Sequence, residues 1–279
     1  MKVVTLAVVF LFGAGNLFGA DQPLLSAASI MKKVAENQDR KQQARASFVY
    51  EESIRVTTRH TNGKLAREES ADYLVAPTPK GTEKKCVLVR GRYWHKGRYV
   101  SFSGEPIPDA NSLDGELTSS FRDDLINDNS KDGLGKDLFP LTTEEQKDLR
   151  FELVGEEIVS GRRAYRIRFA PIDRGDIGWA GEALVDEDEF EPMSIYTRLS
   201  RRMPLFVRAV LGTDLPGFGF STRYTRIDRD VWFPVTFGTE FRLHAIFFIN
   251  RTITVAMESK NFRRATADSR ISYQDTPQK

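Results

Sequence analysis

The sequence contains one cysteine among 279 residues, Cys86, so no disulfide can form within the chain. Small extracellular modules that depend on disulfides are therefore excluded, and a hydrophobic core has to supply the stability. Cys86 also lies far from the N-terminus, so no cysteine is available there for lipid attachment.

Histidine is scarce as well, because only His60, His95 and His244 are present, and none has a second ligand at metal-site spacing. No G-x-S-x-G nucleophile elbow occurs. The pair Gly217 and Gly219 lacks the third glycine and the strand-to-helix setting of a dinucleotide-binding loop. We therefore expect no enzymatic activity, no metal and no cofactor.

An excess of one charge sign is also missing. The formal net charge is +2, and it falls to +1 without residues 1–20, which contain one Lys and no acid. Acidic and basic residues are interspersed along the chain. Nucleic acids and anionic membrane surfaces bind concentrated basic faces, so the sequence indicates neither partner.

An apolar run of notable length stands at the N-terminus. Lys2 precedes the run from Val3 to Phe12, and small residues then lead to Ala20 and the polar Asp21. This order predicts a cleavable signal peptide over residues 1–20, although the large Phe18 leaves the cleavage site open. A membrane span needs roughly 20 apolar residues, so an uncleaved anchor is the lesser alternative. We expect a soluble periplasmic protein without a membrane span after cleavage.

Hydrophobic periodicity predicts one helix followed by a β-rich region. Apolar residues recur at three- and four-residue spacings over residues 24–36, as in an amphipathic helix. The period changes to two over residues 45–58. Further strands and hairpins are predicted over residues 86–104 with breaks at Gly91 and Gly97, and over 153–171, 181–200, 222–243 and 244–262. The result is nine or ten strands, mostly antiparallel.

Residues 112–148 depart from the strand pattern and predict short helices, one of which opens at Thr142 or Thr143. No linker divides the chain, so we expect a single domain over residues 21–265 and a disordered tail over 266–279. The fold class predicted from the pattern is α+β and mainly β.

Three local features admit two interpretations each. The acidic run from Asp186 to Glu189 would suit a calcium site or a solvated hairpin turn, and its lack of EF-hand glycine and glutamate favours the turn. Cys86 follows Lys84 and Lys85, as an activated thiol would, but its apolar run favours a buried structural residue. His95 is interpreted as a hairpin residue.

Residues 203–220 are apolar over most of their length and are interrupted by prolines and glycines. They would form a lid over a cavity or a buried connector between strands. The lid candidates are Leu205, Phe206, Val210 and Leu211.

The sequence has 19 Phe, 8 Tyr and 3 Trp, many of them at the apolar positions of alternating strands. A sheet with one apolar face has to cover that face with helices, a second sheet or a ligand. These aromatics are either all core or partly the lining of a concave lipid-binding cavity. The cavity candidates are Phe48, Tyr50, Ile54, Tyr73, Trp94, Tyr165, Ile167 and Phe169.

The order of these segments resembles the periplasmic lipoprotein-carrier superfamily, which includes outer-membrane lipoprotein-sorting proteins and related envelope sensors. The similar segments are the strand opening Ala46-Ser47-Phe48, residues 87–102, residues 153–171 with Gly155, Gly161 and Tyr165, residues 181–196, and Trp232-Phe233-Pro234. The resemblance implies a single curved antiparallel sheet, or half-open barrel, with helices covering its concave face.

The resemblance also implies a partner, namely the acyl chains of a lipid or an acylated lipoprotein. Three hypotheses follow: a noncatalytic lipid or lipoprotein carrier, a sensory or protein-interaction module with an envelope protein partner, and an exported hydrolase suggested only by the abundant carboxylates. The first is favoured.

Overall fold

The computed structural model describes residues 25–78, 81–127, 139–173, 178–200, 213–214, 218–245 and 249–265. Three of the expected features lie outside these ranges: the signal peptide over residues 1–20, the lid candidates Leu205, Phe206, Val210 and Leu211, and the tail over residues 266–279. These three remain predictions.

The described chain forms three helices and twelve strands. The helices are α1 (Ala27–Arg45), α2 (Leu113–Asn127) and α3 (Thr143–Gln146). The strands are β1 (Phe48–His60), β2 (Leu65–Thr78), β3 (Gly81–His95), β4 (Arg98–Ser103), β5 (Leu149–Val159), β6 (Arg162–Pro171), β7 (Trp179–Asp186), β8 (Pro192–Leu199), β9 (Thr213–Asp214), β10 (Gly219–Asp228), β11 (Val231–Ala245) and β12 (Ile249–Arg264).

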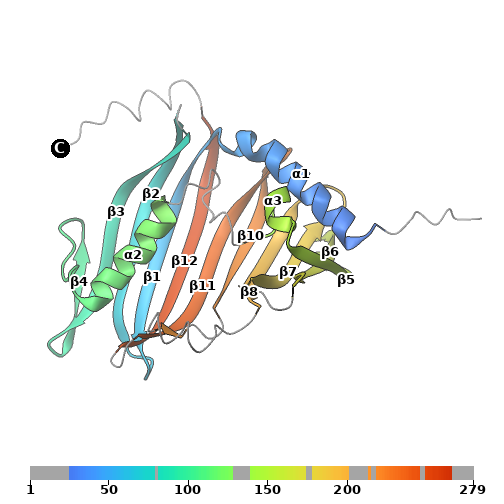
Figure 1. Cartoon of the computed structure of the whole chain (residues 1–279). Helices are drawn as coiled ribbons and strands as arrows, with labels where there is room; N and C mark the ends of the chain where they lie inside the picture. Colours follow the sequence, from blue (N-terminus) through green and yellow to red (C-terminus); the bar gives the residue numbers. More distant parts are fainter. Residues whose placement is uncertain are drawn as a thin grey trace, which may run out of the picture.

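All strands join one antiparallel sheet in the order β4-β3-β2-β1-β12-β11-β10-β8-β7-β6-β5, and the short β9 pairs with β11. The sheet is curved and open, with β4 and β5 at its two edges (Figure 1). Strands from the two ends of the chain, β1 and β12, lie side by side in its middle. The prediction of a mainly β fold with one open antiparallel sheet and helices over its concave face is confirmed.

The sequence predicted nine or ten strands because β2 was not recognised. Its inward positions include Arg67 and Glu69, which are fully or almost fully buried. Charged residues on the buried face hide the apolar alternation by which a half-buried strand is recognised. β2 is nevertheless continuous and pairs with both β1 and β3.

The predicted break at Gly91 is wrong, because β3 runs through this residue to His95 and turns only at Lys96 and Gly97. Gly91 is required for close packing. A Cβ atom at this position would lie 2.6 Å from Phe102 Cζ and closer still to the Glu68 carbonyl oxygen. The glycine therefore allows β2, β3 and β4 to pack closely.

Helix α1 extends nine residues beyond the predicted end at residue 36. It begins after Ser26, whose Oγ accepts a hydrogen bond of 3.1 Å from the Ser29 amide. Its second half buries polar residues, Asn37 and Gln38, which do not contribute to an apolar periodicity. The predicted start of α3 is resolved in favour of Thr142, which forms a reciprocal capping box with Glu145.

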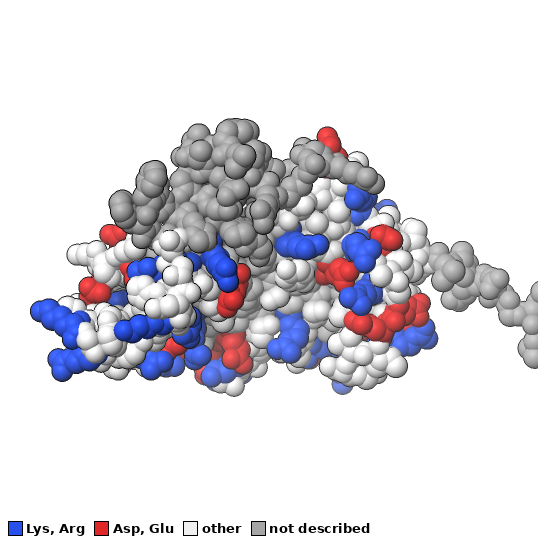
Figure 2. All heavy atoms as spheres, turned by 90° about the horizontal axis from the view of Figure 1, so that it is seen from below, with Lys and Arg blue, Asp and Glu red and all other residues white. Residues whose placement is uncertain are grey.

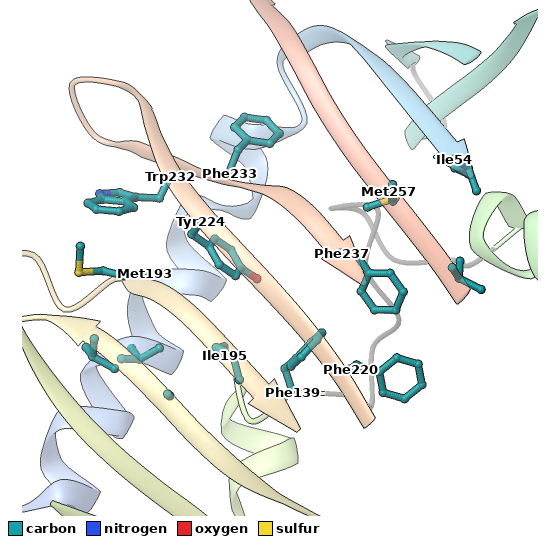
Figure 3. Packing of buried hydrophobic residues seen from close by; sticks show 14 of the residues in the cluster. Ile54, Phe139, Met193, Ile195, Phe220, Tyr224, Trp232, Phe233, Phe237 and Met257 are labelled. Atoms are coloured by element: carbon teal, nitrogen blue, oxygen red, sulfur yellow. The ribbon is translucent and has the colours of Figure 1, made fainter. Parts of the chain in front are cut away.

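The two faces of the sheet differ in character because side chains alternate along each strand. The face that α1 and α2 cover is apolar and forms one continuous core cluster, of which Figure 3 gives a close view. The opposite, convex face carries cross-strand ion pairs such as Arg166 with Glu182 at 2.8 Å. Figure 2, which views the molecule from below, shows acidic and basic residues on its described surface.

Candidate functional site

The candidate site is the concave apolar face, which we define by the buried, inward-facing residues of the central strands. They are Ile54 and Val56 of β1, Ile253, Val255 and Met257 of β12, Phe237 and Phe241 of β11, Phe220 and Tyr224 of β10, and Ile195 of β8. Register explains why they meet, because Ile54 pairs with Met257 and Phe237 pairs with Met257 from the other side. Directly paired residues project from the same face of a sheet.

A chain of aromatic contacts crosses this face from β7 to α2. The ring centroids of Trp179 and Phe220 are 5.3 Å apart, and those of Phe220 and Phe237 are 5.5 Å apart. A branch runs from Phe220 to Phe218 at 4.7 Å and from Phe218 to Phe241 at 4.9 Å. Phe241 in turn lies 5.4 Å from Phe121 of α2. Aromatic pairs at these separations bury large apolar areas and hold fixed mutual orientations.

The described helices cover only parts of this face. α1 packs against β5 and β11, and α2 packs against β1 and β2 (Figure 1). The residues that define the concave face are nevertheless all 9% exposed or less, so they are buried in this structure.

Ion pairs with β2 and with β12 attach helix α2 to the sheet. Arg122 of α2 donates a hydrogen bond to Glu69, which also pairs with the buried Arg67 at 3.0 Å. Asp114, near the start of α2, accepts hydrogen bonds of 2.8 and 3.0 Å from Arg251 of β12. Desolvation acts to raise the pKa of Asp114, but the hydrogen bonds and positive charge around it, mainly those of Arg251, together outweigh it, so the pKa is lowered and the carboxylate stays ionised.

Helix α1 is attached by polar contacts to the turn between β7 and β8. Asn37 Nδ2 donates a hydrogen bond of 2.7 Å to the Glu189 carbonyl oxygen, and Gln38 Nε2 donates one of 2.6 Å to Glu191 Oε2. Lys41 Nζ lies 2.8 Å from the other oxygen of Glu191. Burial raises the pKa of Glu191, and Lys41 opposes this shift.

The acidic run that the sequence placed in a solvated turn does form the β7–β8 turn, but it is not solvated throughout. Asp186 is fully buried and accepts hydrogen bonds of 2.5 and 2.9 Å from Arg162. Glu189 Oε2 accepts one of 2.9 Å from the Trp232 indole. Within the described ranges, no three His, Cys, Asp or Glu residues lie together as a metal site would require. The turn is therefore a structural junction.

Most of the cavity candidates fall in the apolar cluster. Phe48, Tyr50, Ile54, Tyr73, Ile167 and Phe169 are buried in it, and Tyr165 is half-buried against its edge. Their role in binding a ligand stays a prediction. Phe220, Phe237, Phe241, Val255 and Met257 are not among the residues predicted from the sequence, although they alternate with polar residues within residues 219–257.

Trp94 does not join the other candidates. Its neighbour Tyr93 pairs with the inward-facing Arg67, so Trp94 projects from the opposite, convex face. Its ring packs edge-on against Tyr99 at 5.0 Å, and the Lys64 ammonium lies 3.4 Å from its centroid. A shift of one residue in the register of a strand moves its side chains to the other face of the sheet. The register of β3 could not be deduced from the sequence.

The interpretation of Cys86 as a buried residue is wrong, because this cysteine is exposed. A register irregularity in the β2–β3 pairing, between Asp72 and Tyr73, places Cys86 opposite Tyr73. Partial desolvation raises the pKa of the thiol, which disfavours the thiolate that a nucleophile needs. His95 lies at the exposed end of β3 beside the hairpin turn, as expected.

Two depressions lie on the convex face. One, of about 460 Å³, has Arg166, Glu182 and Tyr196 among its lining residues. The other, of about 520 Å³, includes Ser53, Asp72 and Arg90. Charged and hydroxyl-bearing residues supply most of both linings, so neither suits an acyl chain. No helix in the described part of the chain has the length and apolar character needed to cross a bilayer.

No protein-family model matches the sequence, and no curated protein matches it. Similar solved structures include a DUF1329 family protein from Desulfovibrio piger, at 12% identity and a TM-score of 0.41, with 87% of this chain and 95% of that chain covered. A LolA superfamily protein from Nitrosomonas europaea has 12% identity and a TM-score of 0.35, covering 88% and 97%. A putative outer membrane lipoprotein-sorting protein domain from Vibrio parahaemolyticus has 11% identity and a TM-score of 0.35, covering 85% and 94%.

Two of these names come from the lipoprotein-carrier superfamily that the sequence resembles. All three TM-scores are below 0.5 and all identities are near 12%.

Proposed function

We propose that the protein is a noncatalytic carrier that binds the acyl chains of a lipid or an acylated lipoprotein on its concave apolar face, in the cell envelope outside the inner membrane. The observation that supports this proposal is the extent of the apolar concave face, which forms one continuous cluster across the central strands of an open sheet. Apolar surface gains roughly 25 cal/mol for each Å² removed from water, so a long acyl chain is a favourable occupant.

The chemistry of the face supports an acyl ligand over a polar one. Its inward positions are occupied by Phe, Ile, Val and Met, as at Phe237, Val255 and Met257. The flexible thioether of methionine adapts to irregular apolar ligands. The ion pairs that attach α2 lie at β2 and at Arg251 near the start of β12, whereas Val255 and Met257 further along β12 are apolar.

The proposal is tested by photolabelling the purified full-length protein with a diazirine-bearing fatty acid and locating the adducts by mass spectrometry. β12 supplies an internal control, because Ile253, Val255 and Met257 face the concave side while Thr254, Ala256 and Glu258 face the other. We expect adducts at the first three residues and not at the second three, with unlabelled palmitate competing for them.

Adducts confined to the convex residues, or labelling that palmitate does not reduce, would contradict the proposal. A complementary measurement is native mass spectrometry of the protein isolated from the envelope, in which we expect co-purified lipid. Protein that is consistently free of lipid and takes up no acyl probe would also contradict it.

A second candidate function, binding of an envelope protein partner, is favoured by a separate observation at the β5 edge. Among the described strands, β5 pairs only with β6, and its side chains Val154 and Ile158 are 41% and 76% exposed. An open edge with exposed apolar residues can accept a strand from another chain. The variant Ile158→Lys should abolish capture of such a partner and leave acyl labelling unchanged, whereas unchanged capture would exclude this edge.

A further inference from the structure

Two hairpin ends at one end of the sheet bring together positive charge that is separated in the sequence. The β1–β2 turn carries Arg59 and Lys64, and the β3–β4 turn carries Lys96 and Arg98. All four side chains belong to exposed residues. Figure 2 shows Lys and Arg gathered at the end of the molecule that β3 and β4 form.

The two turns are held side by side by pairing and by a direct bond. Arg67 near the start of β2 pairs with Tyr93 near the end of β3, which places the two turns at the same end of the sheet. The Tyr99 hydroxyl donates a hydrogen bond of 3.2 Å to the Leu65 carbonyl oxygen and so joins β4 to β2. We call the four cations with Trp94 and Tyr99 the basic tip.

Few acidic groups compensate this charge. Residues 53–67 and 87–104 contain no Asp or Glu. The nearby Glu68 lies 3.6 Å from Arg92, and Asp114 is bound by Arg251, so both are engaged with other arginines. The near-neutral composition of the whole chain conceals this local excess.

The aromatic residues of the basic tip favour a lipid surface over a nucleic acid. Sites for single-stranded nucleic acids present aromatic faces that are free for base stacking. Here the Lys64 ammonium lies over the Trp94 ring at 3.4 Å, and Tyr99 packs against the same ring at 5.0 Å. Tyr99 itself remains 41% exposed. Tyr and Trp with one polar and one apolar end are enriched where proteins meet the membrane interface.

We propose that the basic tip docks the protein on an anionic phospholipid surface, with Arg59, Lys64, Lys96 and Arg98 binding lipid phosphates and Tyr99 resting at the headgroup level. This interaction goes beyond acyl binding, because it uses a different surface and would orient the sheet on the membrane. Each cation near an anionic membrane contributes roughly fivefold in affinity. Four cations suffice for reversible docking.

The experiment is flotation of the full-length protein with vesicles of phosphatidylcholine alone or mixed two to one with phosphatidylglycerol. We expect binding to the mixed vesicles only, and its loss when ionic strength rises from about 0.1 M to about 1 M, because the Debye length falls from about 10 Å to about 3 Å. Lys96→Gln with Arg98→Gln should weaken binding about 25-fold.

The matched control is Arg150→Gln with Arg263→Gln, which removes the same charge from exposed residues elsewhere on the sheet. We expect it to bind like the unmodified protein, and thermal melting checks that both double variants are folded. Equal binding to neutral vesicles, equal loss in the control, or binding of single-stranded DNA that displaces the vesicles would each overturn the proposal. Because acyl photolabelling reports a different surface, failure here leaves the proposed carrier function intact.

Discussion

Glu52 Oε1 accepts a hydrogen bond of 2.7 Å from Lys84 Nζ on the concave side of the sheet, while Glu52 Oε2 has no hydrogen-bond partner. The Glu52 side chain is 1% exposed and that of Lys84 is 9% exposed. Desolvation raises the pKa of Glu52, and the Lys84 charge acts against this shift. The fold thus tolerates a buried carboxylate at this position because one cation lies beside it.

Removing that cation should destabilise the protein strongly. We expect Lys84→Met to lower the free energy of unfolding by about 3–5 kcal/mol at neutral pH, because a buried carboxylate remains without its partner. The double variant Glu52→Leu with Lys84→Met should recover most of the loss. Urea unfolding of the three proteins measures both effects, and a double variant as unstable as the single one would contradict this account.

The Asp186–Arg162 pair should give a stability contribution that is lost in acid. Desolvation acts to raise the pKa of Asp186, but the hydrogen bonds and charge of Arg162, together with hydrogen bonds from the Glu189 and Asp188 amides, outweigh it and lower the pKa below its ordinary value of 3.8. A lowered carboxyl pKa stabilises the fold above pH 3.8, and this contribution disappears as pH falls through the folded-state pKa. We expect Asp186→Asn to cost about 1.5–3 kcal/mol at pH 7.

The pH dependence supplies the check on this prediction. The cost of Asp186→Asn in urea unfolding should shrink as the buffer is taken below the ordinary pKa of 3.8. Asp188→Asn, in the same turn but exposed, is the control and should cost little at any pH. A cost of Asp186→Asn that stays constant in acid would show that charge is not its source.

Gly91→Ala should disrupt the packing of the β2–β3–β4 edge. The added Cβ would lie 2.6 Å from Phe102 Cζ and closer to the Glu68 carbonyl, so β4 or the Phe102 ring would have to move. We expect a loss of about 1–3 kcal/mol, typical of overpacking. Gly155→Ala in β5 is the control, because its Cβ would meet nothing within 4 Å. Equal thermal melting of both variants would contradict the close-packing role.

The capping box of α3 distinguishes two adjacent threonines. Thr142 Oγ1 accepts a hydrogen bond of 3.3 Å from the Glu145 amide, and Glu145 Oε2 accepts one of 2.9 Å from the Thr142 amide. Thr142→Ala should cost about 1 kcal/mol, whereas Thr143→Ala should cost little, because Thr143 is already inside the helix. Chemical unfolding measures the loss of stability in each variant. A larger loss for Thr143→Ala than for Thr142→Ala would contradict the assignment of Thr142 as the N-cap.

Cys86 should react slowly but completely with a maleimide in the folded protein. The residue is exposed, and its raised thiol pKa reduces the thiolate fraction relative to a free cysteine. The rate at pH 7.0–7.5 should therefore lie below that of the same protein in urea. Intact-mass spectrometry over time measures both rates, and a thiol that reacts only after unfolding would mean that Cys86 is buried.

Much of the architecture could be predicted from local patterns because most strands follow a single rule, the alternation of apolar and polar residues. The hairpins around residues 160–161, 187–189 and 229–230 combine alternating apolar residues with a polar or glycine turn, and all three form as expected. β2 was missed because Arg67 and Glu69 occupy its buried face, where the rule demands apolar residues.

The candidate site was only partly predictable, because facing depends on register. Ile54 and Phe169 belong to regular alternations and were placed correctly in the apolar cluster. Trp94 and Cys86 lie in β3, whose pairing with β2 is irregular. The residue type alone therefore does not show on which face of the sheet Trp94 lies or whether Cys86 is exposed. The basic tip was missed because its residues come together only when two separate hairpins pack side by side.

The central pairing of β1 with β12 has a consequence for how the chain acquires its structure. His60 pairs with Arg251 and Phe48 with Arg264, so the seam joins residues that are about two hundred positions apart. Contacts of such high sequence separation form slowly, because a long loop has to close first. A chain still emerging from a ribosome lacks β12, and both β1 and β11 then keep an open edge. Completion of the sheet therefore has to wait until β12 has been synthesised.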